Sequence, residues 1–328
     1  MAHFAQWPSR QSNQPSPSQQ PSSQTAAHPH LISPAVTSIR RLVWKMAIAT
    51  FVLMAIGSAT RVMNAGLACP DWPLCYGTLV PTQQMNLQVF LEWIHRLDAS
   101  LIGLMAIALV LLSWRRRQQV PSWLPWASVG ALALVLVQGL LGGLTVTELL
   151  RFDIVTAHLG TALLFFTTLL TIGVLLLPRD QLSASQSKWL APCSLAAAVL
   201  VYLQSLSGGL VGSQWALHQC LQLIQLCSVV NVHLLGIIPV TLTAGATAVL
   251  GWRSPVVPVK RLAQTVAGLL SVQLFLGTAT FRLHLQVELL TIAHQVVAAA
   301  LLGSLVGIAV YSLRDRVAAQ SLSPSALH

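Results

Sequence analysis

Four histidines lie inside strongly apolar stretches of the chain. They are His95, His158, His233 and His294. An ionisable side chain within a stretch that could cross a membrane indicates a functional site by default. His95 and His158 are 63 residues apart, and the second pair is 61 residues apart. Each histidine could instead only hydrogen-bond a neighbouring helix, but four at matched positions favour two equivalent sites of two imidazoles.

Paired imidazoles in apolar surroundings favour haem as the bound group. Haem iron accepts two axial imidazoles, and helical bundles hold such cofactors in their interiors. Zinc normally takes four ligands, with cysteine or carboxylate among them. Each histidine lies four to six residues from the start of its apolar stretch. There the positive end of a helix dipole disfavours imidazolium and keeps the ring neutral, as a ligand must be.

One acidic residue distinguishes the two pairs. Glu92 lies three residues before His95 and would share its face of a helix, and Arg96 follows directly. The corresponding stretch around His233 has neither an acid nor an arginine. This asymmetry predicts catalysis at the first pair and cofactor binding at the second. Glu92 could instead simply face water at the interface. Arg96 is a candidate partner for a haem propionate, or an arginine that extends to the interface.

Four of the five cysteines form two pairs in corresponding segments, Cys69 with Cys75 and Cys220 with Cys227. Both segments are expected on the outer side of the membrane, where disulfides persist. A disulfide in each could clamp its loop or exchange electrons by thiol chemistry. The structural clamp is the favoured interpretation. Cys193 has no partner and is expected to be a small core residue.

The composition predicts a membrane protein. Of the 328 residues, 55% are hydrophobic and 8% are charged, whereas soluble domains are about 25% charged. The mean hydropathy is +0.70. A net charge of +10 could indicate nucleic-acid binding, but cationic cytoplasmic loops explain it better. We expect an all-α fold of eight transmembrane helices, at about 42–63, 90–113, 123–144, 154–177, 189–212, 229–250, 262–281 and 289–312.

Charge placement predicts the orientation of these helices. Fourteen of the 18 lysines and arginines fall on one side, which places both termini in the cytoplasm. The haem sites then lie towards the outer face. Residues 1–39 contain 20 Ser, Pro or Gln residues and are expected to be a disordered cytoplasmic tail. Residues 317–328 are expected to be a short second tail.

The chain repeats itself. Three of the predicted helices carry Gln-x3-Gly near the outer end, and the first has Leu53 and Gly57 in the same frame. Such glycines would let the backbone approach a flat porphyrin. We expect two parallel four-helix halves, 40–180 and 181–316, as in other membrane folds. The three motifs are Gln138/Gly142, Gln204/Gly208 and Gln273/Gly277.

Two motifs carry a family resemblance. The run from Asn64 to Cys75, NAGLACPDWPLC, precedes Glu92-x-x-His95-Arg96. Together they resemble the haem A synthase family. The resemblance extends over about residues 42–313 and includes Gln138-Gly139-x-x-Gly142-Gly143 and Thr156-Ala157-His158.

The resemblance implies a reaction and a role for each site. Haem A synthases oxidise the C8 methyl group of haem O to a formyl group, with oxygen from water, giving haem A for cytochrome oxidase. It implies that His95 and His158 hold haem O, and that His233 and His294 ligate a haem b. Glu92 would stabilise a cationic intermediate or deprotonate water. Haem O synthase and cytochrome oxidase assembly factors are candidate partners, and the electron acceptor stays open.

Three alternatives are less favoured. A bis-haem electron-transfer protein, a quinol-linked cytochrome b, needs the same four histidines but not Glu92. A transporter is supported only by the parallel repeat, and its polar groups would gather at the midplane. A prenyl transferase such as haem O synthase needs carboxylate clusters to hold Mg²⁺, and no loop carries such a cluster.

Overall fold

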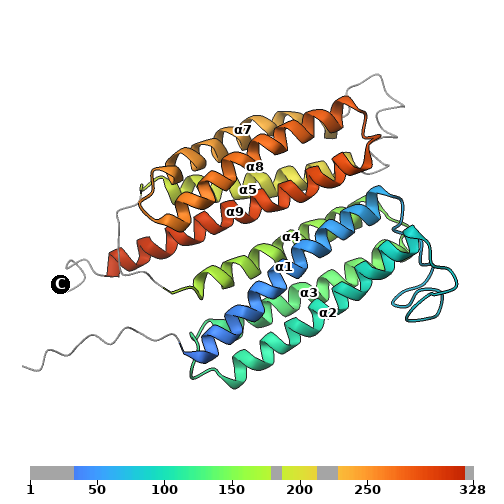
Figure 1. Cartoon of the computed structure of the whole chain (residues 1–328), viewed down its shortest axis with the longest axis horizontal. Coiled ribbons are helices and arrows are strands. Elements are labelled where there is room, and N and C mark those ends of the chain that lie inside the picture. The colour runs from blue at the N-terminus through green and yellow to red at the C-terminus, as the bar shows by residue number, and fades with distance from the viewer. Residues whose placement is uncertain (1–32, 179–186, 213–227, 322–328) are drawn as a thin grey trace, which may run out of the picture. The chain divides into compact units, whose positions relative to one another are not determined.

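The computed structural model describes residues 33–178, 187–212 and 228–321, and this part of the chain is all-helical. Apart from one isolated bridge between Cys75 and Thr78, these residues contain no β-structure. The predicted all-α class is confirmed (Figure 1). The helices are α1 (Pro34–Val62), α2 (Leu87–Arg115), α3 (Leu124–Thr147), α4 (Phe152–Leu175), α5 (Leu190–Val211), α7 (Ser228–Trp252), α8 (Val257–Arg282) and α9 (Glu288–Ser321).

All eight helices are long and apolar enough to cross a membrane, with spans of 22 to 29 residues. At about 1.5 Å per residue, even the shortest exceeds the roughly 30 Å of a hydrocarbon core. Large apolar side chains such as Ile48, Leu104 and Phe275 are exposed on the helix surfaces. Lipid is the solvent that such a surface requires, so the chain is an integral multi-pass membrane protein.

Two helix ends differ from the expected boundaries. Helix α1 begins at Pro34, so residues 34–39 are helical rather than part of the tail. The Ser33 hydroxyl caps this end by accepting a hydrogen bond from the Val36 N–H at 3.2 Å, and Ile39 is fully buried. Composition alone does not show where α1 begins, because Ser and Pro are common both in disordered tails and at helix N-termini. Helix α9 likewise continues to Ser321, and residues 1–32 lie outside the described residues.

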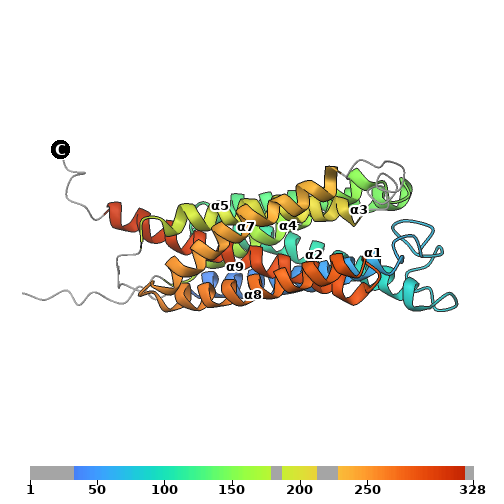
Figure 2. The same ribbon diagram turned by 90° about the horizontal axis from the view of Figure 1, so that it is seen from above.

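The helices pack in two neighbouring groups. Helices α1 to α4 contact one another, and so do α5, α7, α8 and α9 (Figures 1 and 2). Leu109 and Leu169 are buried in the first group, and Leu305 and Ile308 in the second. Helices α1 and α4 also contact α9, and α4 contacts α5, so Ser33 onwards forms one compact unit. The division near residue 180 into two functional halves stays a prediction.

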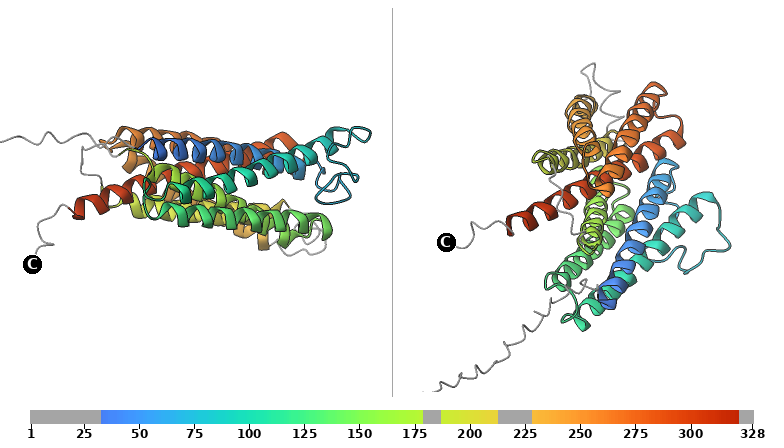
Figure 3. Two further views of the ribbon diagram at one scale, coloured as in Figure 1. Left: turned by 90° about the horizontal axis from the view of Figure 1, so that it is seen from below. Right: turned by 60° about the vertical axis from the view of Figure 1, so that its left-hand side comes forward.

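One end of the bundle carries the long α1–α2 loop, and we call it the loop end. The α3–α4 and α8–α9 turns lie at this same end (Figure 3). These two turns have the same backbone: two successive residues with positive φ, Leu149 and Leu150 in one and His284 and Leu285 in the other. In both, the second residue donates its N–H to the carbonyl five residues before it. The match supports the predicted repeat.

Candidate functional site

Each of the four histidines packs against a glycine on the preceding helix. Helices α2, α4, α7 and α9 begin at the loop end and carry the histidines five to eight residues from their starts. A Cβ atom added to the glycine would lie only 2.8 to 3.4 Å from the imidazole Cε1. The pairs are Gly57–His95, Gly142–His158, Gly208–His233 and Gly277–His294. The repeated glycines therefore make room for imidazoles, whereas the sequence suggested room for a porphyrin.

The fold brings the first two histidines together. The ring centroids of His95 and His158 are 6.5 Å apart, with an angle of 62° between the rings. Metal–imidazole bonds of about 2.0 Å on both sides of one ion would separate two ring centroids by about 6 Å. His233 and His294 are also close enough for their charges to interact. The first pair therefore has the proximity that two axial ligands of one iron require.

Several polar atoms around the imidazoles are buried without a hydrogen bond. They include Nδ1 of His95, His158 and His294, and Oε1 of Gln138 and Gln273. Buried polar atoms without partners are uncommon in native proteins, and a bound group is one explanation for them. Imidazole nitrogens are ligands for haem iron. Among the described residues, no group of three or more His, Cys, Asp or Glu side chains is placed to hold a metal ion by itself. The residues present fit a haem at each pair.

Two glutamines of the repeated motif face imidazole nitrogens. The amide Nε2 of Gln138 lies 3.3 Å from Nε2 of His158, and Gln273 stands in the same relation to His294. Gln204 instead donates to the backbone carbonyl of His233 at 2.6 Å. The Ser207 hydroxyl contacts His233 Nδ1 at 2.9 Å. The side-chain surroundings of His233 therefore differ from those of the other three histidines.

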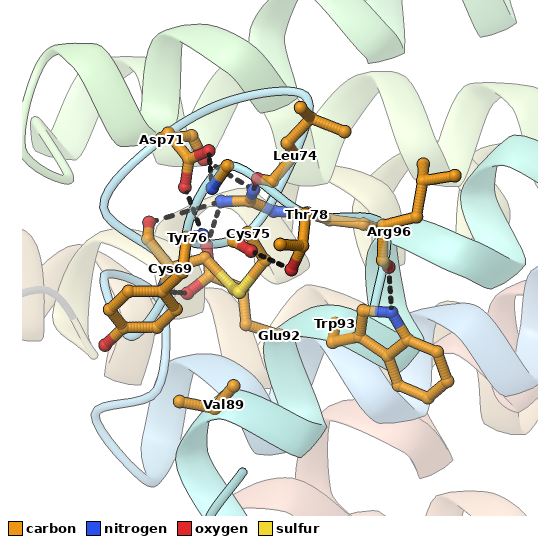
Figure 4. The surroundings of a disulfide bond; sticks show 12 residues. Cys69, Asp71, Leu74, Cys75, Tyr76, Thr78, Val89, Glu92, Trp93 and Arg96 are labelled. Carbon is orange, nitrogen blue, oxygen red and sulfur yellow. Dashed lines mark hydrogen bonds and ion pairs between the residues drawn. A yellow bond between two sulfur atoms is a disulfide. The ribbon is translucent and has the colours of Figure 1, made fainter. Parts of the chain in front are cut away.

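Glu92 is buried beside His95, with a side chain that the α1–α2 loop encloses. The residue is 4% exposed. Its Oε2 accepts a hydrogen bond from the Cys69 N–H at 2.7 Å, and its Oε1 pairs with the Arg96 guanidinium (Figure 4). A buried carboxylate is costly unless it is paired and hydrogen-bonded, and both conditions hold here. The buried carboxylate is therefore paired and hydrogen-bonded one helical turn before His95.

Arg96 ties the loop to helix α2. Its Nη1 donates to the carbonyls of Asp71, at 2.6 Å, and Leu74 (Figure 4). The Asp71 carboxylate in turn accepts the backbone N–H groups of Tyr76 at 2.6 Å and Gly77 at 2.8 Å. These bonds, with the Gly77 N–H first, lower the pKa of Asp71. The guanidinium is thus committed to Glu92 and the loop, and its role towards a propionate stays a prediction.

The predicted disulfide between Cys69 and Cys75 is confirmed. Both residues are buried and pack with Val89 of α2. Trp72, inside the closed ring, lies against Gly143 of α3, where an added Cβ would be 3.3 Å from the indole. Gly143 follows Gly142, on which the His158 ring lies. The disulfide ring therefore contacts α2, which carries His95, and α3, against which His158 packs. Cys220 and Cys227 lie outside the described residues, and Cys193 is a free cysteine of α5.

Comparison with known proteins places the chain in a family. A family model described as cytochrome oxidase assembly protein, COX15-CtaA, matches residues 40–306. The chain belongs to this family. The match includes both histidine pairs, Glu92 and both cysteine pairs, and the resemblance stated from the motifs is confirmed.

Curated relatives in this family are heme A synthases. The protein from Shewanella oneidensis is 32% identical over 200 residues, which is 55% of this chain and 59% of that protein. The Bacillus pumilus protein is 28% identical over 149 residues, 44% of this chain and 47% of that protein. The Sphingopyxis alaskensis protein is 23% identical over 228 residues, 57% of this chain and 64% of that protein. The alignments thus span about half to two thirds of these relatives.

Two features of the family member were not predicted from its sequence. The sequence shows the repeated Gln-x3-Gly spacing, but it does not show that each glycine packs on an imidazole. It also does not show the hydrogen bond from the Cys69 N–H to Glu92, although both residues belong to the motifs named above. A sequence signal exists for the glycine–imidazole packing, because the glycines and the histidines repeat together. No sequence signal exists for the hydrogen bond to Glu92, because the type of a side chain does not determine which backbone N–H it binds.

Proposed function

We propose that this chain is a haem A synthase, which oxidises the C8 methyl group of haem O to a formyl group with oxygen from water. The observation that carries the proposal is the asymmetry between two otherwise similar sites. A buried carboxylate paired with an arginine, Glu92, lies beside His95, and helix α7 has no acid in the stretch around His233. Family membership and the names of the relatives support the same activity.

In this proposal His95 and His158 hold the substrate haem O, and His233 and His294 hold a haem b. Haem b, when bound, supplies a one-electron acceptor and donor between the substrate site and an external acceptor. The glycine under each imidazole fixes the ring against the backbone, so each ligand is oriented before the haem arrives. Gln138 and Gln273 give two of the ring nitrogens a polar neighbour inside the bundle.

Glu92 is the catalytic carboxylate in this proposal. Its carboxylate is held by the Cys69 N–H and by the ion pair with Arg96, and the residue is buried. A fixed charge of this kind stabilises positive charge that develops on the porphyrin as electrons leave. The same oxygens can accept the proton of the attacking water, which is general-base catalysis. The loop that binds Glu92 limits access of other water to the site.

The orientation and partners belong to this proposal. The loop end, with both histidine pairs, faces the outer side, because fourteen of the eighteen basic residues fall on the other side. Both termini are then cytoplasmic. Haem O synthase is the proposed supplier of substrate, and cytochrome oxidase assembly factors are the proposed recipients of haem A.

The test is extraction and chromatography of the haems from protein produced together with haem O. The wild type should yield haem b together with haem O or haem A. Glu92→Gln should keep haem b and lose haem A, while Glu148→Gln, an exposed carboxylate at the same end, should change neither. His233→Ala should lose haem b. Full haem A formation by Glu92→Gln would overturn the catalytic assignment.

A bis-haem electron-transfer protein is the second candidate, favoured by the likeness of the two histidine pairs. It predicts haem b alone, in both sites, in the wild type and in Glu92→Gln. The same chromatogram therefore separates the two functions.

A further inference from the structure

The His95–His158 pair is called the first site here, and the His233–His294 pair the second site. Contacts join the two sites through residues that directly follow a ligand histidine or its supporting glycine in the chain. The Ser58 hydroxyl of α1 donates to Oε1 of Gln295 on α9 at 2.6 Å. Ser58 follows Gly57, on which the His95 ring lies. Gln295 follows His294. One hydrogen bond therefore links the residue after Gly57, which supports His95, to the residue after His294.

A second contact makes the matching link. Leu159 of α4 follows His158, and Gly209 of α5 follows Gly208, on which the His233 ring lies. A Cβ added to Gly209 would lie 2.9 Å from a methyl carbon of Leu159, so the two residues are in close contact. His95 is thus connected to His294, and His158 to His233. Each connection runs through one contact between residues that are next to these histidines or their glycines in the chain.

A third contact fixes the same helices. The Arg61 guanidinium of α1 donates to the Gly209 carbonyl at 2.6 Å. Arg61 lies one helical turn after Gly57 and so on the same side of α1. It joins α1 to α5 at the residue that Leu159 contacts. The two helix groups are therefore joined by three contacts at the level of the histidines.

We infer that these contacts couple the two sites, so that haem held by His233 and His294 positions His95 and His158 for the substrate haem. The inference rests on the proposed assignment of haem to the four histidines. Packed interfaces transmit small shifts because they do not deform freely. Ser58 is 6% exposed, so its bond to Gln295 has little competition from water. Ser58, Gln295 and Leu159 are positioning residues, because they act through the glycines and histidines next to them in the chain.

Coupling between two sites is reciprocal: each ligand changes the affinity for the other by the same factor. This supplies a test that does not depend on haem A formation. Haem b serves as the probe for both sites, and its loss from the second site to an excess of a haem-scavenging globin is followed by absorbance. The loss is compared between protein with the first site filled and protein with that site disabled by His95→Ala and His158→Ala.

In the wild-type background, filling the first site should slow haem loss from the second by a factor in the roughly 5- to 150-fold range of known couplings. Ser58→Ala and Gln295→Leu should each reduce that factor, and the double variant should reduce it no further because both remove one contact. Gln295→Glu keeps an oxygen acceptor for Ser58 and should retain the factor.

The control is Ser304→Ala, which removes a buried hydroxyl of α9 bonded to the Ala300 carbonyl of its own helix, and which should leave the factor unchanged. If Ser58→Ala does not fold, Leu159→Ala tests the second link in the same way. An unchanged factor in Ser58→Ala, Gln295→Leu and Leu159→Ala would overturn the coupling. Binding of two haems per protein by the double variant His233→Ala and His294→Ala would instead overturn the assignment of haem to this site, so the two failures are distinct.

Discussion

The carboxylate of Glu92 accepts its hydrogen bond from the backbone of Cys69, at 2.7 Å. The acid proposed for catalysis is therefore held by a half-cystine of the disulfide ring. The ring is a short loop, with the two cysteines six residues apart, and its backbone position depends on being closed. This relationship gives the disulfide a defined mechanical role at the first site.

The first prediction concerns the disulfide. Replacing Cys69 and Cys75 by serine should lower haem A formation about tenfold or more, because a hydrogen bond to a charged group contributes about 1.5–3 kcal/mol and its donor is no longer fixed. Chromatography of extracted haems measures the effect. His95→Ala, which removes a ligand, should abolish formation. Equal losses in the two variants would show that the sulfur atoms take part in electron flow.

The second prediction concerns the pH dependence of the loop. Because hydrogen bonds from the Gly77 and Tyr76 N–H groups lower the pKa of Asp71, its contribution to loop order is present above the usual pKa of about 3.9. That contribution is lost as the pH falls through the lowered pKa of the folded protein. The protection of the Tyr76 and Gly77 amides against hydrogen exchange, relative to the intrinsic exchange rate at each pH, should therefore stay high down to the ordinary range of an aspartate and fall below it.

The matched variant is Asp71→Asn, whose side chain carries no charge at any pH. Exchange at the same two amides should be faster than in the wild type at neutral pH and should show no transition on acidification. An acid transition that persists in Asp71→Asn would assign the pH dependence to another group.

The third prediction concerns the glycine under His294. An alanine at Gly277 would place Cβ 2.9 Å from the imidazole Cε1 and displace the ring. Overpacking costs about 1–3 kcal/mol, so Gly277→Ala should weaken haem binding about ten- to a hundredfold. Absorbance titration with haem b measures it. Gly268→Ala, on the same helix with open space around it, should bind haem as the wild type does.

The fourth prediction concerns the glutamine beside His294. Gln273 Nε2 lies 3.3 Å from the ring nitrogen Nε2, and an iron ligated through this nitrogen must displace the amide. Removing a net hydrogen bond of about 0.5–1.5 kcal/mol from the haem-free protein should tighten haem binding about two- to tenfold in Gln273→Leu. Gln264→Leu, an exposed position of the same helix, is the control in the same titration. Weaker binding in Gln273→Leu would show that the amide supports the bound state instead.

Much of the helical framework could be predicted from the sequence, because transmembrane helices are recognised by the length and hydropathy of their apolar stretches. The eight predicted stretches all lie on helices, and the differences are at the ends. Helix α1 starts at Pro34 because a serine cap and buried side chains extend it beyond the most apolar stretch. Such ends depend on local hydrogen bonds and on neighbours, which composition does not report.

The candidate site could be predicted only in part. The four histidines and Glu92 stood out because ionisable groups are rare in apolar stretches. The common repeat of glycines and histidines indicates that they belong together, but the contact itself depends on how far one helix is shifted along the next. The enclosure of Glu92 by Cys69 and Arg96 depends on the path of the α1–α2 loop, and loop backbones follow no periodic rule.

The two links between the histidine sites have one further consequence. Ser58 and Gly209 each follow a glycine that supports an imidazole, and Gln295 and Leu159 each follow a histidine. The Ser58–Gln295 and Gly209–Leu159 contacts are therefore two copies of a single contact, related as in an isologous interface between identical subunits. A homodimer of one four-helix chain would make this contact twice. Joined in one polypeptide, the two copies have been free to diverge, one into a hydrogen bond and the other into apolar packing.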